Sequence, residues 1–175
     1  MKYLLIISIA LLVACDEKKE NVFMDESVET KAIMQTIEGE TNAFFNGKYE
    51  EWTSFWSHDS MAMQAWNNSD GSADAAIGWD QINQQGKYWI DTYYKNGKNV
   101  IHPEVKKEEP KVMFFDDYTA YLMWKQYNTD QDKQYYSVSQ ETRLMKKEDG
   151  KWKILNVSAF WSTEDKIAVD SLEIK

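Results

Sequence analysis

The predominant spacing of apolar residues changes along this chain near Gly97, and this change most limits the folds it can adopt. Before Gly97, apart from a short alternating segment over 61–66, apolar side chains recur every three or four residues, as on one face of a helix. After it, apolar and polar residues alternate, which is typical of strands with one buried face. Helices followed by a run of long strands predict one α+β domain, with about three helices covering an antiparallel sheet.

Three segments show helical spacing: 27–46, a short stretch around Trp52, and 80–94. The first has a stripe of apolar residues and ends at Gly47, a usual helix terminator. Gly86 lies in the middle of the third helix, where it costs roughly 1 kcal/mol relative to Ala. We therefore expect a neighbouring group to pack closely against Gly86.

Six segments show the alternation of strands: 61–66, 100–105, 111–115, 118–127, 134–146 and 151–162. Pro103 cannot donate to a ladder, so it places the second segment at a sheet edge. The last four segments form two predicted hairpins, which turn at Asp116-Asp117 and at 147–150. The polar stretch 67–74 predicts a loop.

The N-terminus has the three parts of a secretory signal: Lys2, an apolar run over 3–13, and small Ala14 before Cys15. Leu12-Val13-Ala14-Cys15 resembles the lipobox of bacterial lipoproteins, which implies cleavage before Cys15 and acylation of its thiol. The run is shorter than the about 20 apolar residues of a membrane-spanning helix. We expect a signal peptide over 1–14, a tether over 15–26, a domain over 27–162 and a tail over 163–175. The lipid would anchor the protein to a membrane of the bacterial cell envelope, on the periplasmic or outer surface.

Charge and cysteine content exclude several functions. The formal net charge is −9 and no Lys/Arg cluster is present, so nucleic acid is a poor partner. Cys15 is the single cysteine, and acylation would leave no thiol for a disulfide, a nucleophile or a metal. His102 and Glu104 flank Pro103 and are too few for a metal site, so we expect no metal and no cofactor.

The motifs around the second hairpin carry a family resemblance. The run Glu148-Asp149-Gly150-Lys151-Trp152-Lys153-Ile154 looks like the C-terminal hairpin of the nuclear transport factor 2-like (NTF2-like) superfamily, closest to its SnoaL-like and ketosteroid-isomerase-like branches. The resemblance implies a bent sheet wrapped around helices as a cone, with a pocket in its open end. It also implies homodimers that form through the sheet face. Such domains include isomerases, dehydratases, hydrolases and proteins without catalysis.

The pocket residues decide between these functions. Proton transfer needs a carboxylate base and an oxyanion partner, and the candidates are His58, Asp59, Asp91 and Glu141. No candidate stands out by its spacing, and His58 fits better as a capping or solvated residue after the second helix. The final strand carries Asn156-Val157-Ser158-Ala159, which has no titrating group near neutral pH.

Aromatic residues are abundant and some are expected to line the pocket. The predicted lining consists of Trp56, Met63, Trp89, Trp124, Gln126, Tyr136, Asn156, Ser158 and Phe160. Such a lining favours a small apolar or aromatic ligand held by a few neutral polar groups. Two hypotheses remain: a binding module for a small hydrophobic ligand or a partner protein, and a proton-transfer enzyme or related hydrolase. The first is favoured because no base is identifiable.

Overall fold

The computed structural model describes residues 24–68, 70–95, 103–130 and 132–174, and it is a mixed α+β domain. Its helices are α1 (Glu26–Phe45), α2 (Tyr49–Ser54), α3 (Trp79–Trp89), a π-helix (Ile90–Tyr94) and a short 3-10 helix (Val169–Ser171). Its strands are β1 (Met63–Asn67), β2 (Ala73–Ile77), β3 (Val105–Lys107), β4 (Lys111–Asp116), β5 (Thr119–Thr129), β6 (Tyr135–Glu148) and β7 (Lys151–Ala168). The predicted fold class is therefore confirmed. The predicted signal peptide, most of the tether, and residues 100–102 of the expected edge strand lie outside the described residues.

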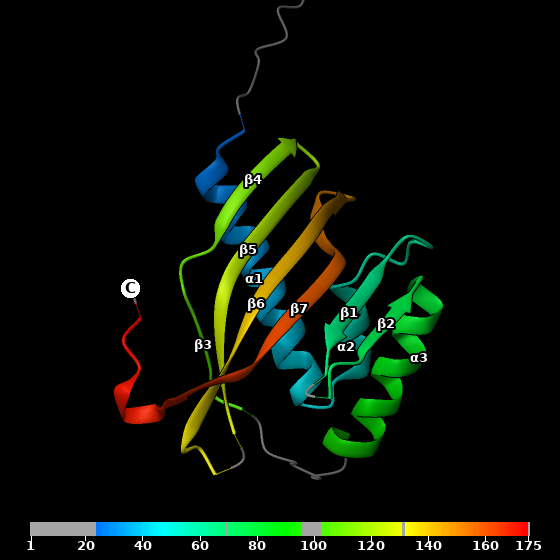
Figure 1. The fold of residues 1–175 in the computed structure, drawn as a ribbon. Helices are drawn as coiled ribbons and strands as arrows, with labels where there is room; N and C mark the ends of the chain where they lie inside the picture. Colours follow the sequence, from blue (N-terminus) through cyan, green and yellow to red (C-terminus); the bar gives the residue numbers. More distant parts are fainter. Residues whose placement is uncertain (1–23, 69, 96–102, 131, 175) are drawn as a thin grey trace, which may run out of the picture.

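The seven strands form one curved, open sheet in the order β2-β1-β7-β6-β5-β3, and β4 pairs with the first half of β5 while β3 pairs with its last residues. All pairs are antiparallel except β1 with β7, which run parallel. Helix α1 runs along one face of the long strands, while α2 and α3 lie beside β1 and β2 (Figure 1). Helix α1 covers one face of the long strands, and we call the opposite face the outer face.

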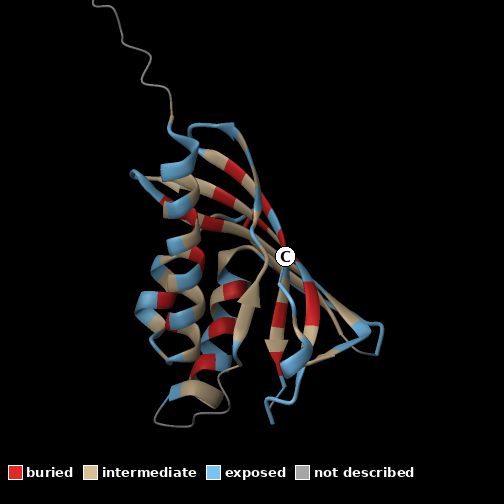
Figure 2. Cartoon of the chain, turned by 90° about the vertical axis from the view of Figure 1, so that its left-hand side faces the viewer, coloured by how far each residue is buried: buried red, intermediate tan, exposed pale blue. Residues whose placement is uncertain are grey.

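The helices bury one side against the sheet and against each other. Asp25 caps α1 by accepting hydrogen bonds from the backbone N–H groups of Ser27 and Val28. Ile33 and Ile37 of α1 are buried, and Figure 2 shows the buried residues where helices and sheet face one another. The side chains between the two layers therefore form the main hydrophobic core.

The expected close contact at Gly86 is confirmed. A Cβ atom at Gly86 would lie 2.1 Å from Cη2 of Trp52, far inside van der Waals contact. Trp52 is almost completely buried, so its indole has no room to move away. Glycine at this position lets α3 approach α2 closely, which explains why a helix tolerates it.

A second, smaller core lies at the other end of the sheet. Tyr127, Tyr136 and Val138 are buried there and pack against Ile167 and neighbouring apolar residues of the C-terminal segment. Strand β7 runs through Ala168, so residues 163–168, which the sequence assigned to a tail, extend the sheet. The segment predicted as the loop 67–74 also differs, because β2 begins at Ala73 and pairs with β1.

A β-bulge in β7 reverses the direction of its side chains. Met145 pairs with Ile154, but Leu144 pairs with Asn156, so Leu155 is an extra residue without a partner in the ladder. The simple alternation predicted from the sequence placed Trp152, Ile154, Asn156, Ser158 and Phe160 on one face. After the bulge the inward positions pass instead to three odd-numbered residues, Val157, Ala159 and Trp161. Asn156, Ser158 and Phe160 therefore lie on the outer face, before a second register shift that follows Trp161.

Candidate functional site

A cavity of about 390 Å³ lies between the helices and the inner face of the sheet. Side chains of α1, α3, the π-helix, β1, β5, β6 and β7 contribute to its walls. Seven aromatic residues line it: Phe44, Phe45, Trp56, Trp66, Trp89, Tyr94 and Trp161. Trp89 is 40% exposed, so the cavity wall reaches the molecular surface at the end of α3. Its size lies within the range of about 300–1,000 Å³ of ligand pockets.

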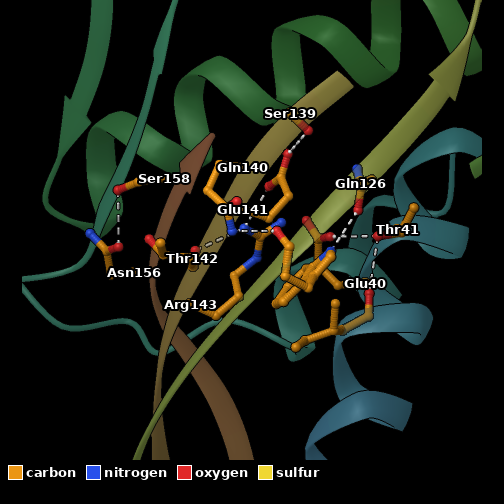
Figure 3. A network of polar contacts seen from close by, with 12 residues as sticks. Glu40, Thr41, Gln126, Ser139, Gln140, Glu141, Thr142, Arg143, Asn156 and Ser158 are labelled. Atoms are coloured by element: carbon orange, nitrogen blue, oxygen red, sulfur yellow. Dashed lines mark hydrogen bonds and ion pairs between the residues drawn. The ribbon is translucent and has the colours of Figure 1, made fainter. Parts of the chain in front are cut away.

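A buried ion pair stands in the wall that β6 provides (Figure 3). Arg143 Nη1 donates to Glu141 Oε2 at 2.8 Å and to the Thr142 carbonyl at 2.9 Å. Ser139 Oγ donates to the other oxygen of Glu141 at 2.6 Å. The exposed fractions are 2% for Glu141 and 9% for Arg143. Pairing of this kind compensates the cost of removing two charges from water, and it fixes both side chains.

The guanidinium of Arg143 also lies over an aromatic ring. Its Cζ atom is 4.9 Å from the ring centroid of Trp124, which is within the range of a cation–π interaction. Trp124 Nε1 in turn donates to Gln126 Oε1 at 3.2 Å. Arg143 and Gln126 line the cavity. Trp124 contacts both residues but does not line the cavity itself.

Glu40 of α1 brings a second carboxylate to the cavity. Its Oε1 accepts hydrogen bonds from Nε1 of Trp52 at 2.7 Å and of Trp56 at 3.2 Å. Burial raises the pKa of Glu40 above its ordinary value, although these indole donors and the charge of Arg143 act in the opposite direction. Glu40 is therefore protonated more readily than an exposed glutamate, and it can hold a proton at the cavity wall.

The predicted pocket residues fall into three groups. Trp56, Trp89 and Gln126 line the cavity, as does Glu141 from the catalytic candidates. Trp124 lies beneath Arg143, and Tyr136 belongs to the second core, where its hydroxyl donates to Glu104 at 3.1 Å. The remaining four do not line the cavity and share the outer face: Met63, Asn156, Ser158 and Phe160.

The four outer-face residues were misplaced for two physical reasons. The bulge at Leu155 turns Asn156, Ser158 and Phe160 outward, and Phe160 is 60% exposed. Met63 pairs with Asn156 across the parallel β1–β7 ladder, so it shares the face of its partner. In Figure 3, Asn156 and Ser158 lie apart from the Glu141–Arg143 pair and hydrogen-bond to each other at 3.2 Å.

The other catalytic candidates do not line the cavity. His58 stacks on Trp79 with 4.0 Å between ring centroids, and its Nε2 lies 3.0 Å from the Thr53 carbonyl. Asp59 accepts from the backbone of Met61 at 2.9 Å and from Lys146 at 3.2 Å. Asp91 pairs with Lys87 and Lys95 along one side of the helix. His58 is therefore held by a ring contact, and Asp59 and Asp91 are held in ion pairs with lysines.

Sequence reasoning missed several polar residues of the cavity, above all Glu40 and Arg143. Glu40 follows Ile37 by three residues and precedes Phe44 by four, so it continues the apolar stripe of α1. Arg143 alternates with Glu141 and Met145 on the inward side of β6. A charged residue at an inward position is the signal that would have identified both, because charged residues are rarely buried without a special reason.

Neither a metal cluster nor a membrane-spanning helix is found in the described part of the chain. No group of three or more His, Cys, Asp or Glu side chains could hold an ion among residues 24–68, 70–95, 103–130 and 132–174. His102, one of the two neighbouring residues weighed as metal ligands, lies outside these ranges. Within the same ranges, no helix is long and apolar enough to cross a bilayer.

The outer face carries an uncharged row that crosses five strands. Met113, Tyr121, Leu144, Asn156 and Met63 are register partners across β4, β5, β6, β7 and β1. The next row consists of Met123, Thr142 and Ser158, with Lys111 at its edge, and a third pairs Phe160 with Gln140 and Lys125. None of these positions is acidic, although the chain as a whole has an excess of acidic residues.

Comparison with known proteins identifies the fold. The profile of the family "Calcium/calmodulin dependent protein kinase II association domain" matches residues 29–161. No curated protein matches the chain. Among solved structures, an NTF2-like protein of unknown function from Shewanella oneidensis has 18% identity and a TM-score of 0.55, with 75% of this chain and 98% of that chain covered.

Two further structures show the range of this fold. The association domain of CaMKII from C. elegans has 16% identity and a TM-score of 0.56, with coverage of 77% of this chain and 96% of that one. A protein from Novosphingobium aromaticivorans named as a candidate scytalone dehydratase has 13% identity and a TM-score of 0.56, covering 86% and 91%. At these identities the likeness establishes the NTF2-like fold that the sequence motifs suggested, and this fold occurs in both association domains and enzymes.

Proposed function

This chain belongs to the calcium/calmodulin dependent protein kinase II association domain family, and we propose that its domain is a non-catalytic module that binds a small organic ligand in the cavity. The observation that carries this proposal is the composition of the cavity wall. Seven aromatic and eight polar side chains share the wall, and the charged ones are held in place by Ser139, Trp52 and Trp56. Aromatic walls with polar groups in fixed positions are typical of ligand pockets.

The experiment is a thermal-shift screen of small organic compounds on the full chain and on a cavity-filling variant. A ligand at 100 times its dissociation constant should add about 2.7 kcal/mol to the free energy of unfolding. Ala159→Phe fills the cavity and should abolish the shift. Ser158→Phe is the matched control, because it adds the same side chain to the outer face one residue away. A screen without any shift, or shifts that persist in Ala159→Phe, would refute the proposal.

A second candidate function is proton transfer, and Glu40 is the observation that favours it. Burial raises the pKa of this carboxyl, and its place on the cavity wall would bring it near a bound substrate. An enzyme of this kind should catalyse exchange of the α-hydrogens of enolisable ketones with deuterated water, which NMR detects directly. The exchange should disappear in Glu40→Gln. Equal exchange in the wild type, the variant and a protein-free sample would exclude this function for those substrates.

We also propose that the chain self-associates through its outer face, as a homodimer. The family is named for association, and the three rows of the outer face contain no acidic residue. Its apolar side chains Met113 and Phe160 are more than half exposed in the single chain. Pairing two such faces would remove apolar surface from water.

The proposed location is a membrane of the bacterial cell envelope, with the lipid on Cys15. The support is the sequence of residues 1–15, and the charged segment after Cys15 would separate the domain from the bilayer. Mass spectrometry of the mature N-terminus tests this proposal, because acylation adds the mass of two or three chains to Cys15. A chain that retains Met1, or an unmodified Cys15, would refute it.

A further inference from the structure

The end of the domain at which α1 begins is held together by contacts between three elements. Glu29 in the first turn of α1 accepts hydrogen bonds from Lys147 Nζ at 2.8 Å and from Trp152 Nε1 at 2.6 Å. The backbone N–H of Lys147 donates to the carbonyl of Tyr118 at 2.7 Å. These bonds bring the start of α1, the β4–β5 turn and the β6–β7 turn to one end of the domain (Figure 1). We call it the tether end, because the tether expected over 15–26 joins the domain there.

Three apolar side chains of the tether end are exposed to solvent. Val28, Phe115 and Tyr118 are each more than half exposed. Phe115 has no partner in the ladder, because the register of β4 and β5 shifts between Phe114 and Asp116. Tyr118 lies in the turn itself, so two exposed aromatic side chains lie at the tip of one hairpin. Exposed apolar side chains that gather in one place mark contact sites, whereas scattered ones are ordinary.

The tether limits how far this end can lie from the proposed membrane. Cys15 and Asp25 are ten residues apart. Even a fully extended chain of that length spans at most about 36 Å, and a flexible one averages about 17 Å. With a lipid on Cys15, the tether end is therefore the part of the domain that is held nearest to the bilayer. The high local concentration of lipid allows a contact of few side chains to be occupied.

The chemistry of the hairpin tip fits the uncharged part of a bilayer interface. Tyrosine combines an apolar ring with a hydroxyl group and is enriched where membranes meet water. Asp116 Oδ1 accepts from the backbone N–H of Tyr118 at 2.8 Å, and Asp117 follows it, so the turn carries two acidic residues. Anionic lipids attract basic segments and not acidic ones, so apolar contact must supply the attraction here.

We propose that the tip of the β4–β5 hairpin docks on the lipid bilayer, with Phe115 and Tyr118 inserted among the lipid headgroups and Val28 beside them. This inference rests on the proposed lipid anchor at Cys15 and adds an orientation to it. Strand β5 begins at the tether end, so its other end, at Thr129, points away from the membrane.

The test uses the mature, acylated full chain in phosphatidylcholine vesicles, with an environment-sensitive fluorophore on an introduced cysteine. Asp117→Cys carries the probe at the hairpin tip, and Gln134→Cys carries it at the opposite end of the sheet. Lipid with brominated acyl chains should lower the fluorescence at position 117 about twofold, since interfacial side chains reach about 5–10 Å into the headgroup boundary. It should leave the fluorescence at position 134 unchanged.

Variants of the Asp117→Cys chain test which side chains make the contact. Phe115→Ser combined with Tyr118→Ser should remove the quenching. Tyr135→Ser should retain it and is the matched control, because Tyr135 is an exposed aromatic residue at the start of β6, far from the tether end. These changes affect exposed side chains, so the thermal midpoints should stay close to that of the wild type.

Equal quenching at both probe positions, or quenching that persists in the double variant, would overturn the proposal. An acylated chain without quenching at position 117 would overturn it too, while the anchor on Cys15 would stand. If the thiol-reactive fluorophore labels the wild-type chain, Cys15 carries no lipid, and both the anchor and the docking fail. A signal at position 117 that depends on protein concentration and not on brominated lipid would assign the tip to a contact between copies, against the proposal.

Discussion

Substitution of Arg143 by Met should destabilise the domain strongly, because it leaves the partner carboxylate buried and unpaired. Glu141 is 2% exposed, and after the change it would keep a single hydrogen bond, from Ser139. Loss of one partner of a buried ion pair costs about 3–5 kcal/mol. We expect a value of about 3 kcal/mol, at the lower end of that range, because the adjoining cavity can admit water to Glu141. For a domain of this size the midpoint should fall by roughly 6–12 °C.

Urea unfolding of the full chain measures this cost, and two further variants isolate its cause. The double variant Glu141→Gln/Arg143→Met removes both charges and should be more stable than Arg143→Met alone, since no charge is then stranded. Lys48→Met is the matched control, because Lys48 pairs with Glu51 at 3.0 Å on the exposed surface. A surface pair contributes about 0–1 kcal/mol. Equal costs for Arg143→Met and Lys48→Met, or a double variant as unstable as the sum of its single changes, would refute the reasoning.

Three further predictions concern other parts of the domain. Gly86→Ala should lower the unfolding free energy by about 1–2 kcal/mol, since the clash with Trp52 outweighs the helix propensity of Ala; calorimetry that shows stabilisation would contradict the close contact. Burial raises the pKa of Glu40, so the unfolding free energy should fall as pH rises from its ordinary value of 4.5 to the raised value, by up to about 1.4 kcal/mol per pH unit, and then level off; a Glu40→Gln variant with the same pH profile would contradict this. Phe160→Glu should convert a dimer to monomers in light scattering, whereas Tyr118→Glu, in the exposed β4–β5 turn, should not; a dimer that survives Phe160→Glu would exclude the outer face as its interface.

The elements with regular spacing could be predicted from the sequence because their signal is local. The stripe of α1 and the alternation of β4 and β5 depend on side chains a few residues apart, and the structure places those elements within a few residues of the prediction. Strand β2 was missed because Ala73–Ile77 contains small residues and four of its five residues are exposed, so neither face stands out. Its stability comes from pairing with β1, which no local pattern shows.

The cavity was harder to predict because its composition depends on one inserted residue. With strict alternation, the face that begins with Trp152 and Ile154 would continue to Phe160, and Leu155 would be an ordinary outward residue. The bulge at Leu155 exchanges the faces, so an error of one position changes every later assignment on β7 and, through the parallel ladder, that of Met63 on β1.

A polar residue at an inward position marks a candidate site even where the faces of a neighbouring strand are predicted wrongly. Glu40 interrupts the apolar stripe of α1, and Arg143 interrupts the inward row of β6. The periodicity of both elements is clear. Asn128 does the same near the end of β5, on the side that carries Leu122 and Trp124. Each lowers stability relative to an apolar side chain unless it is paired, and such local conflicts with the fold are expected where a protein binds or reacts. All three line one cavity although they come from three elements, as the proposed ligand-binding function requires.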